Sequence, residues 1–182
     1  MQPQHTNRMD GMVAIVTGAS RGLGRAIARE FAAEGAKVVV SARQNSPTGL
    51  PGTAVETAER IRHQGGEAMA LTCDVSNEEQ VMAMVGQTID MYGRIDVLVN
   101  NAGVMVLGET LLDIVPEAWD QSVAANLKGP YLCCRSVVPW MIEQGRGSII
   151  HIGSRMGSDA GQGGGVLYSS TKAAVHMFSY CL

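Results

Sequence analysis

Five short apolar runs divide the chain, and amphipathic or polar segments separate them. Each run is rich in β-branched residues and apolar almost throughout, which is typical of strands that helices cover on both faces. The alternation of such strands with helical segments predicts an α/β fold with a parallel sheet. The predicted strands are residues 12–17, 37–42, 67–74, 95–100 and 148–153.

Right-handed crossovers between five strands in this sequence order most simply give a doubly wound sheet with the strand order 3-2-1-4-5. In such a sheet the connections reverse direction between strands one and four. A ligand is expected at that point, beyond the carboxyl ends of the strands. The residues just after each strand are therefore the first candidates for function.

Local signals place two of the crossover helices. Apolar side chains between the first two strands recur every four residues and predict a buried stripe on a helix, and Gly35 follows where a left-handed residue would end it. Ser76 lies three residues before Glu79, a capping-box spacing that predicts a second helix running to about Tyr92. The prolines and glycines of residues 43–53 predict a surface loop. The side chains of the predicted stripe are Leu23, Ile27 and Phe31.

Composition predicts one domain without a nucleic-acid, membrane or metal partner. The 182 residues are 46% hydrophobic and carry a net charge of -3, and Lys and Arg are scattered rather than clustered. The four cysteines form neither a CxxC pair nor a Cys/His ligand spacing. The polar N-terminus has no signal-peptide core, so we expect a soluble, cytoplasmic protein. Residues 1–10 are predicted as a disordered or extended tail and residues 11–182 as the domain.

A glycine-rich segment, TGASRGLG at 17–24, follows the first predicted strand. Glycines at a strand-to-helix turn let the backbone approach a pyrophosphate, which N–H groups and the positive helix end then bind. The Gly-x-x-x-Gly-x-Gly spacing departs from GxGxxG, and the absence of GK[ST] argues against an ATPase-type phosphate loop. A tight turn without a ligand is the alternative, but the flanking strand and helix favour a nucleotide. The candidate residues are Gly18, Ser20, Arg21, Gly22, Leu23 and Gly24.

With Thr17 in front, this spacing resembles that of the short-chain dehydrogenase/reductase family. Three further stretches carry the resemblance: Asp74-Val75 after the third strand, the NNAG of residues 100–103 after the fourth, and YSSTK at 168–172. Together they extend from about residue 10 to the end of the chain. The resemblance implies a Rossmann-like fold and an oxidoreductase that moves a hydride between a nicotinamide cofactor and a carbonyl or secondary alcohol.

The resemblance also implies roles at the adenosine end. Asp74 would accept a hydrogen bond from the adenine amino group, and Val75 would pack beside the ring. The three residues that follow Asn100 would form the floor under the ribose, whereas Asn100 itself would tie neighbouring strands together. A helix-entry aspartate and an ordinary Asn/Gly turn are the plainer alternatives. The floor residues are Asn101, Ala102 and Gly103.

Charge after the second strand favours NADP over NAD. An acidic residue there would bind the ribose hydroxyls of NAD and repel a 2'-phosphate, whereas a basic residue would attract it. This region reads Ser41-Ala42-Arg43, and Arg21 offers a second guanidinium. NADP is therefore the preferred cofactor and NAD the alternative, while solvated surface arginines are the interpretation without a ligand.

Tyr168 and Lys172 lie four residues apart and hence on one face of a helix. A free tyrosine has a pKa near ~10, and a neighbouring cation favours its phenolate, so this pair suits general acid/base chemistry. By the resemblance, Tyr168 would exchange a proton with the substrate oxygen, and Lys172 would also bind the nicotinamide ribose. Both residues are thereby expected to contact the cofactor. Ser154 would orient the substrate carbonyl, and Asn126 would hold a water that links the lysine to solvent.

One departure from the family concerns the serine. Ser154 precedes Tyr168 by fourteen residues, whereas many relatives use thirteen, the position of Arg155. A one-residue expansion of the intervening loop would absorb the difference, and Ser158 is a weaker substitute. His151, between apolar neighbours in the fifth strand, is interpreted as structural.

The chain is shorter than members of the family, which continue with two further strands and a substrate-covering loop. We therefore expect an incomplete, C-terminally truncated domain whose fifth strand is an exposed edge and whose homo-oligomer contacts are weakened. Two hypotheses stay open: an active oxidoreductase for a small carbonyl or alcohol, and a silent chain that binds nucleotide or acts as an interaction partner. A sugar-nucleotide epimerase shares the Tyr-x-x-x-Lys pair, but its glycine spacing usually differs.

Overall fold

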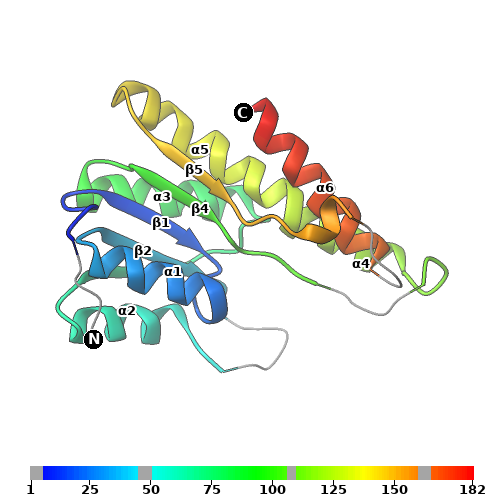
Figure 1. Cartoon of the computed structure of the whole chain (residues 1–182), viewed down its shortest axis with the longest axis horizontal. Coiled ribbons are helices and arrows are strands. Elements are labelled where there is room, and N and C mark those ends of the chain that lie inside the picture. Colours follow the sequence, from blue (N-terminus) through cyan, green and yellow to red (C-terminus); the bar gives the residue numbers. More distant parts are fainter. Residues whose placement is uncertain (1–5, 45–50, 106–109, 160–164) are drawn as a thin grey trace.

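The computed structural model describes residues 6–44, 51–105, 110–159 and 165–182. Five parallel strands in this part of the chain form one sheet in the order β3-β2-β1-β4-β5, which confirms the predicted topology. The direction of the connections reverses between β1 and β4, at the switch point (Figure 1). The strands are β1 (Val13–Thr17), β2 (Lys37–Ala42), β3 (Glu67–Thr72), β4 (Val97–Asn100) and β5 (Ser148–His151).

Four strands are shorter than the apolar runs predicted, β1 by its first residue only. β3 ends at Thr72, β4 begins at Val97 and β5 ends at His151. The residues trimmed from β3 and β4 include Asp74 and Asp96, whose carboxylates accept hydrogen bonds from Ser76 and Arg94, each two residues away. Local hydrogen bonds from polar side chains compete with strand pairing, so a strand can end before its apolar sequence pattern does.

Helices cover both faces of the sheet, as expected for a doubly wound fold. α1 and α2 lie on one face, and α3 and α5 lie on the other (Figure 1). Within the part of the chain that the structure describes, no helix combines the length and apolarity needed to cross a bilayer. The helices are α1 (Gly22–Ala33), α2 (Ala54–His63), α3 (Glu78–Tyr92), α4 (Pro116–Val123), α5 (Gly129–Glu143) and α6 (Val166–Cys181), with a π-helical turn at Ala124–Lys128 and a 3-10 turn, η2, at Arg155–Gly157.

Two cores form because alternate strand residues face opposite sides. Val16 and Val38 belong to the core under α1 and α2, whereas Ile15 and Val39 belong to the core under α3 and α5. Consecutive residues in the middle of β1 and β2 are therefore apolar, as the sequence suggested. β5 lies at an edge of the described sheet and is less covered, with Ile150 40% exposed.

The buried face of α1 differs from the predicted stripe. Leu23 is 56% exposed, and Ile27 and Phe31 are only partly buried. Small residues face the sheet instead, because they let the helix axis approach the strands more closely than large side chains would. Gly35 has a φ of +96° after the helix, as predicted. The buried residues of α1 are Gly24, Ala28 and Ala32.

The N-terminus of α3 also corrects the sequence prediction. Asn77, not Ser76, is the capping residue, and its side chain accepts a hydrogen bond from the Gln80 N–H at 3.0 Å. Ser76 instead donates its backbone N–H and its hydroxyl to Asp74 Oδ1, at 3.0 and 2.7 Å. An ionised carboxylate accepts stronger hydrogen bonds than a neutral group does, so Ser76 bonds to Asp74 and does not cap the helix. α3 does end at Tyr92.

The predicted tail and loop are described only in part. Residues 6–10 are not extended: Met9 donates to Glu34 O at 2.9 Å and packs against the first core. Residues 1–5 of the predicted tail and 45–50 of the predicted loop 43–53 lie outside the described residues. At the far end of that loop, Thr53 caps α2.

Candidate functional site

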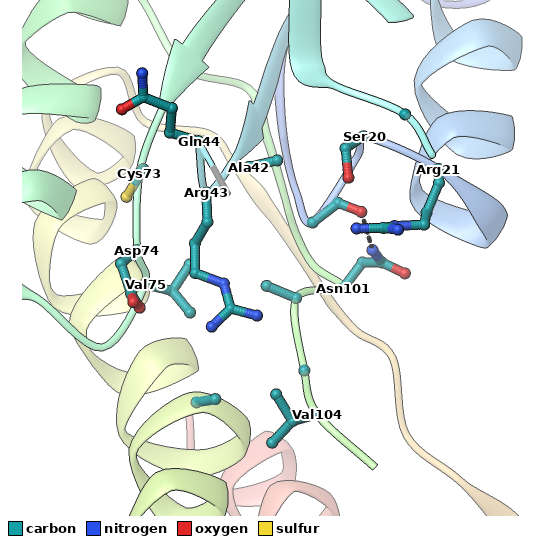
Figure 2. Close-up of a pocket in the computed structure, with 15 residues that line it drawn as sticks. Ser20, Arg21, Ala42, Arg43, Gln44, Cys73, Asp74, Val75, Asn101 and Val104 are labelled. Carbon is teal, nitrogen blue, oxygen red and sulfur yellow. Dashed lines mark hydrogen bonds between the residues drawn. The ribbon is translucent and has the colours of Figure 1, made fainter. Parts of the chain in front are cut away.

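A cavity of about 220 Å³ lies at the carboxyl ends of the strands beside the switch point (Figure 2). Most of the predicted cofactor residues line it, but Gly22, Leu23, Gly24, Tyr168 and Lys172 do not. Among the described residues, no group of three or more His, Cys, Asp or Glu is arranged to hold a metal ion. The predicted residues that line the cavity are Gly18, Ser20, Arg21, Arg43, Asp74, Val75, Asn101, Ala102 and Gly103.

The turns after β1 and β4 are joined at the floor of this cavity. Thr17 Oγ1 accepts hydrogen bonds from the N–H groups of Asn101 and Ala102, both at 3.1 Å. Asn101 Nδ2 donates back to the carbonyls of Thr17 and Gly18, at 2.9 and 3.1 Å. Gly18 has a φ of +65°, and a Cβ atom there would lie 2.8 Å from Ala102 Cα. This position therefore requires glycine for its conformation and for the close approach of the two turns.

The N-terminus of α1 opens onto the glycine turn and fits an anionic group. α1 begins at Gly22, its N-cap Arg21 makes no side-chain capping bond, and no acidic residue lies in its first turn. A Cβ on Gly24 would lie 2.6 Å from Gly18 O, so glycine is required for the helix to sit directly on the turn. The helix end carries partial positive charge, and the glycine turn beside it lets the backbone approach a ligand closely. Both properties favour binding of the pyrophosphate of a dinucleotide.

Two arginines flank the cavity from different elements. Arg43 follows β2, and Figure 2 shows its exposed side chain extending into the cavity between Val75 and Asn101. Arg21 lines the cavity from the glycine turn. Two guanidinium groups on the cavity wall make the cavity favourable for an additional phosphate.

The remaining cavity residues suit binding rather than covalent chemistry. Asp74 uses Oδ1 to accept both hydrogen bonds from Ser76, which fixes the carboxylate beside Val75. Cys73 also lines the cavity, but burial raises the pKa of its thiol to about 11. A thiolate nucleophile is therefore scarce at neutral pH.

Tyr168 and Lys172 lie together on α6, as their spacing predicted. Lys172 Nζ is 5.7 Å from the centroid of the Tyr168 ring. The lysine is buried, at 6% exposure, and its ammonium donates to Ile152 O just after β5. Burial lowers the pKa of this ammonium. The positive charge is thus held in a partly desolvated place, where its effect on a neighbouring phenol is larger than in water.

Asn126 links the cavity to α6. It is buried in the π-helical turn between α4 and α5, a distortion of the kind that is frequent at functional sites. Its Oδ1 accepts from Val104 N at 2.7 Å, and its Nδ2 donates to Val104 O at 2.9 Å and to Thr171 Oγ1 at 3.1 Å. Val104 lines the inner end of the cavity, and Thr171 is the neighbour of Lys172 on α6. The hydrogen bonds therefore run without a break from the cavity to α6.

Ser154 lies two residues after Ile152, whose carbonyl oxygen accepts the hydrogen bond from Lys172. Its Oγ accepts a hydrogen bond from Met156 N at 3.2 Å and so caps η2, while its own hydroxyl hydrogen can be donated elsewhere. Arg155, at the position that many family members give to the serine, is exposed. Residues 160–164, in the loop before Tyr168, lie outside the described residues.

His151 and Asn100 have the structural surroundings that the sequence suggested. Asn100 Nδ2 lies 3.3 Å from His151 Nδ1 and joins β4 to β5, which are paired at these two residues. The imidazole packs edge-on against Phe178 at 5.4 Å between ring centroids. Burial lowers the pKa of His151, and the positive charge of Lys172 lowers it further.

Several residues of this region were not predicted from the sequence, and three of them hydrogen-bond to predicted catalytic residues. Val104 and Thr171 are the partners of Asn126, and His176 accepts a hydrogen bond from the Ser154 N–H at 3.3 Å. His176 lies four residues after Lys172, a spacing that places both on one face of α6 and that was visible in the sequence. Thr171 lies within the YSSTK stretch, but nothing in the sequence indicated its bond to Asn126 or the part played by Val104.

Comparison with known proteins gives consistent matches over nearly the whole chain. Residues 12–182 match the family model of the short chain dehydrogenases. The chain is 37% identical over 182 residues to Elsinochrome reductase 1 of Elsinoe fawcettii, covering 100% of this chain and 65% of that protein. It is 40% identical over 171 residues to the 3-oxoacyl-[acyl-carrier-protein] reductase of Synechocystis sp., covering 94% and 66%.

A solved structure agrees with these matches. The crystal structure of a metagenomic short-chain oxidoreductase in complex with NADP superimposes with a TM-score of 0.84 at 39% identity, covering 93% of this chain and 74% of that one. The chain spans about 65% of the length of the Elsinoe relative. The similarity in sequence therefore coincides with the same arrangement of strands and helices.

Proposed function

The chain belongs to the short-chain dehydrogenase family, and we propose that it transfers a hydride between NADP(H) and a carbonyl or secondary alcohol, with Tyr168 as general acid/base. The observation that carries the proposal is the hydrogen-bonded path from Val104 through Asn126 to Thr171. This path couples the cavity that fits a dinucleotide to the helix that holds Tyr168 and Lys172. The reductase names of the two curated relatives and the NADP complex of the solved structure support the same assignment.

The residues around the cavity would hold the cofactor, which supplies or accepts the hydride when bound. Gly18 and the N-terminus of α1 would bind the pyrophosphate, and Arg43 with Arg21 would bind the 2'-phosphate. Asp74 and Val75 would hold the adenine, above the floor formed by residues 101–103. Apart from the first residues of α1, the residues given these roles lie on the cavity wall.

The residues of α6 and of the β5 end would handle the proton and the substrate oxygen. Tyr168 would donate its phenolic proton to the oxygen in reduction and accept it in oxidation. The nearby ammonium of Lys172 would stabilise the phenolate, and the Ser154 hydroxyl would donate to the same substrate oxygen. The Asn126 side chain, bonded to Val104 and Thr171, would position the site, and it would also hold a water that links the lysine to solvent.

The test is a fluorescence titration of the purified protein with NADPH and NADH, followed by turnover measurements on a panel of ketones and aldehydes. We expect tighter binding of NADPH and oxidation of NADPH by at least one carbonyl. Tight binding without any turnover would instead support the silent nucleotide-binding chain. Failure to bind either nucleotide would overturn both interpretations.

Arg43→Ala should weaken NADPH binding about tenfold and leave NADH binding nearly unchanged, because a charge-assisted bond to a phosphate is worth roughly 1.5–3 kcal/mol and this side chain is exposed. The dissociation constants of both nucleotides measure the effect. Arg60→Ala, an exposed arginine on α2 outside the cavity, removes the same charge and serves as the control. Equal losses for NADPH and NADH would contradict a role at the 2'-phosphate.

A further inference from the structure

Two side chains of α6 hold the segment that follows β5. Lys172 Nζ donates to Ile152 O, as described above. One helical turn later, His176 Nε2 accepts from the backbone N–H of Ser154 at 3.3 Å, and His176 Nδ1 lies 3.2 Å from Ser158 Oγ. The imidazole therefore contacts both ends of the 154–158 segment. Lys172 is explained by its place beside Tyr168, but His176 has no part in the proposed chemistry so far.

Two glycines show that this segment is seated directly on α6. A Cβ on Gly153 would lie 2.5 Å from His176 Nε2, and a Cβ on Gly157 would lie 2.7 Å from the carbonyl carbon of Lys172. A side chain at position 157 would push the segment away from the helix backbone, and one at position 153 would displace the imidazole. The imidazole is thus packed directly against the backbone that carries Ser154.

The hydrogen-bond partners fix the protonation of the imidazole. A backbone N–H can only donate, so Nε2 must be the unprotonated nitrogen. The proton of the neutral ring is then on Nδ1, where it is donated to Ser158 Oγ. Each ring nitrogen has one partner and one role, and the orientation of the ring follows from the pair of bonds.

We propose that His176, as the Nδ1–H tautomer, is a positioning residue that holds the Ser154 backbone and thereby aims the Ser154 hydroxyl. The proposal rests on the proposed function, in which that hydroxyl donates to the substrate oxygen. Ser154 is then held from two sides, by His176 at its N–H and by Met156 N at its Oγ. Because Oγ already accepts from Met156 N, the role left for the hydroxyl is to donate its hydrogen to the substrate oxygen.

Loss of this contact should affect turnover more than binding. A displacement of about 1 Å at a group that orients a reacting atom can cost on the order of a hundredfold in rate. We expect His176→Leu to lower kcat at least about tenfold, with a smaller change in KM. The Kd for NADPH should stay the same, because His176 does not line the cofactor cavity.

The experiment compares His176→Leu with His176→Gln, whose side-chain amide can still accept from Ser154 and donate to Ser158. Met177→Leu, an exposed neighbour on the same helix, is the matched control. For each protein we would measure kcat, KM, the NADPH Kd and the melting temperature. Hydrogen exchange of the Ser154 amide and the ¹⁵N shifts of the His176 ring are recorded in addition, since neither depends on turnover.

The expected result is a protonated Nδ1 in the wild type, fast exchange of the Ser154 amide in His176→Leu, and recovery of both protection and kcat in His176→Gln. A protonated Nε2, or Ser154 protection that does not change in His176→Leu, overturns the proposal whether or not the protein is active. A kcat that stays at the wild-type value in His176→Leu also overturns it. A wild type that turns over no carbonyl refutes the proposed function and the catalytic part of this inference, while the exchange and tautomer data decide separately whether His176 holds Ser154.

Discussion

Tyr168→Phe should lower kcat for carbonyl reduction by roughly 10²–10⁴, the range that general acid/base catalysis contributes. The substitution removes one oxygen and keeps the ring that lies 5.7 Å from Lys172 Nζ, so the packing of α6 should be retained. The variant loses the proton donor for the substrate oxygen, and the positive charge of Lys172 no longer has a phenolate to stabilise. Steady-state oxidation of NADPH in the presence of the best carbonyl of the panel measures the loss.

The control for this substitution lies on the same helix. Tyr180 is 86% exposed near the C-terminal end of α6, and Tyr180→Phe should leave kcat unchanged. The NADPH Kd of Tyr168→Phe should change little, because Tyr168 does not line the cofactor cavity. Unchanged turnover in Tyr168→Phe would remove this residue from the mechanism and leave the proposed reaction without its acid.

The strand order and the position of the cofactor cavity could be predicted because both depend on topology. Parallel strands with right-handed crossovers permit few arrangements, and their carboxyl ends meet at one edge. Gly18, Asp74 and Asn101 therefore come together simply because each follows a strand. The precise buried face of α1 could not be predicted, since hydrophobicity does not show that Ala28 approaches the sheet more closely than Leu23.

The link between the cavity and α6 depends on contacts that a linear pattern does not contain. Asn126 reaches Val104 and Thr171 from a π-helical turn, and no residue propensity distinguishes such a turn from the α-helix on either side. Likewise, the spacing of Lys172 and His176 predicts a shared helix face, but not that His176 accepts from a backbone N–H. Side-chain to backbone bonds of this kind are decided by tertiary packing.

The opposite end of the sheet carries the second large expected effect: Asp96→Asn should lower the free energy of unfolding by about 2–3 kcal/mol. Asp96 is 5% exposed and accepts from the Val13 N–H at 3.0 Å, from Arg94 at 2.6 and 2.7 Å, and from Arg146 at 3.1 Å. A neutral amide keeps the shape but loses the charge that both guanidinium groups need. For a chain of this size the melting temperature should fall by roughly 4–12 °C.

Asp90→Asn, at an exposed position on α3, removes the same charge and should change the free energy of unfolding by less than about 0.5 kcal/mol. Urea unfolding of the wild type and the two variants measures these differences. A loss in Asp96→Asn no larger than that in Asp90→Asn would show that the two arginines contribute nothing through this carboxylate.

The pH dependence of the Asp96 effect has a defined sign. Burial by itself raises the pKa of this carboxyl, but the hydrogen bonds from Arg94 and Val13 and the charges of Arg94 and Arg146 outweigh burial, so the pKa lies below its usual value of 3.8. A lowered folded-state pKa gives a stabilisation that is complete above the unfolded-state pKa and is lost as the pH falls through the folded-state value. The deficit of Asp96→Asn should therefore be full near neutral pH and shrink below about pH 4. A deficit that stayed constant into acid would mean that side-chain geometry, and not ionisation, stabilises this end of the sheet.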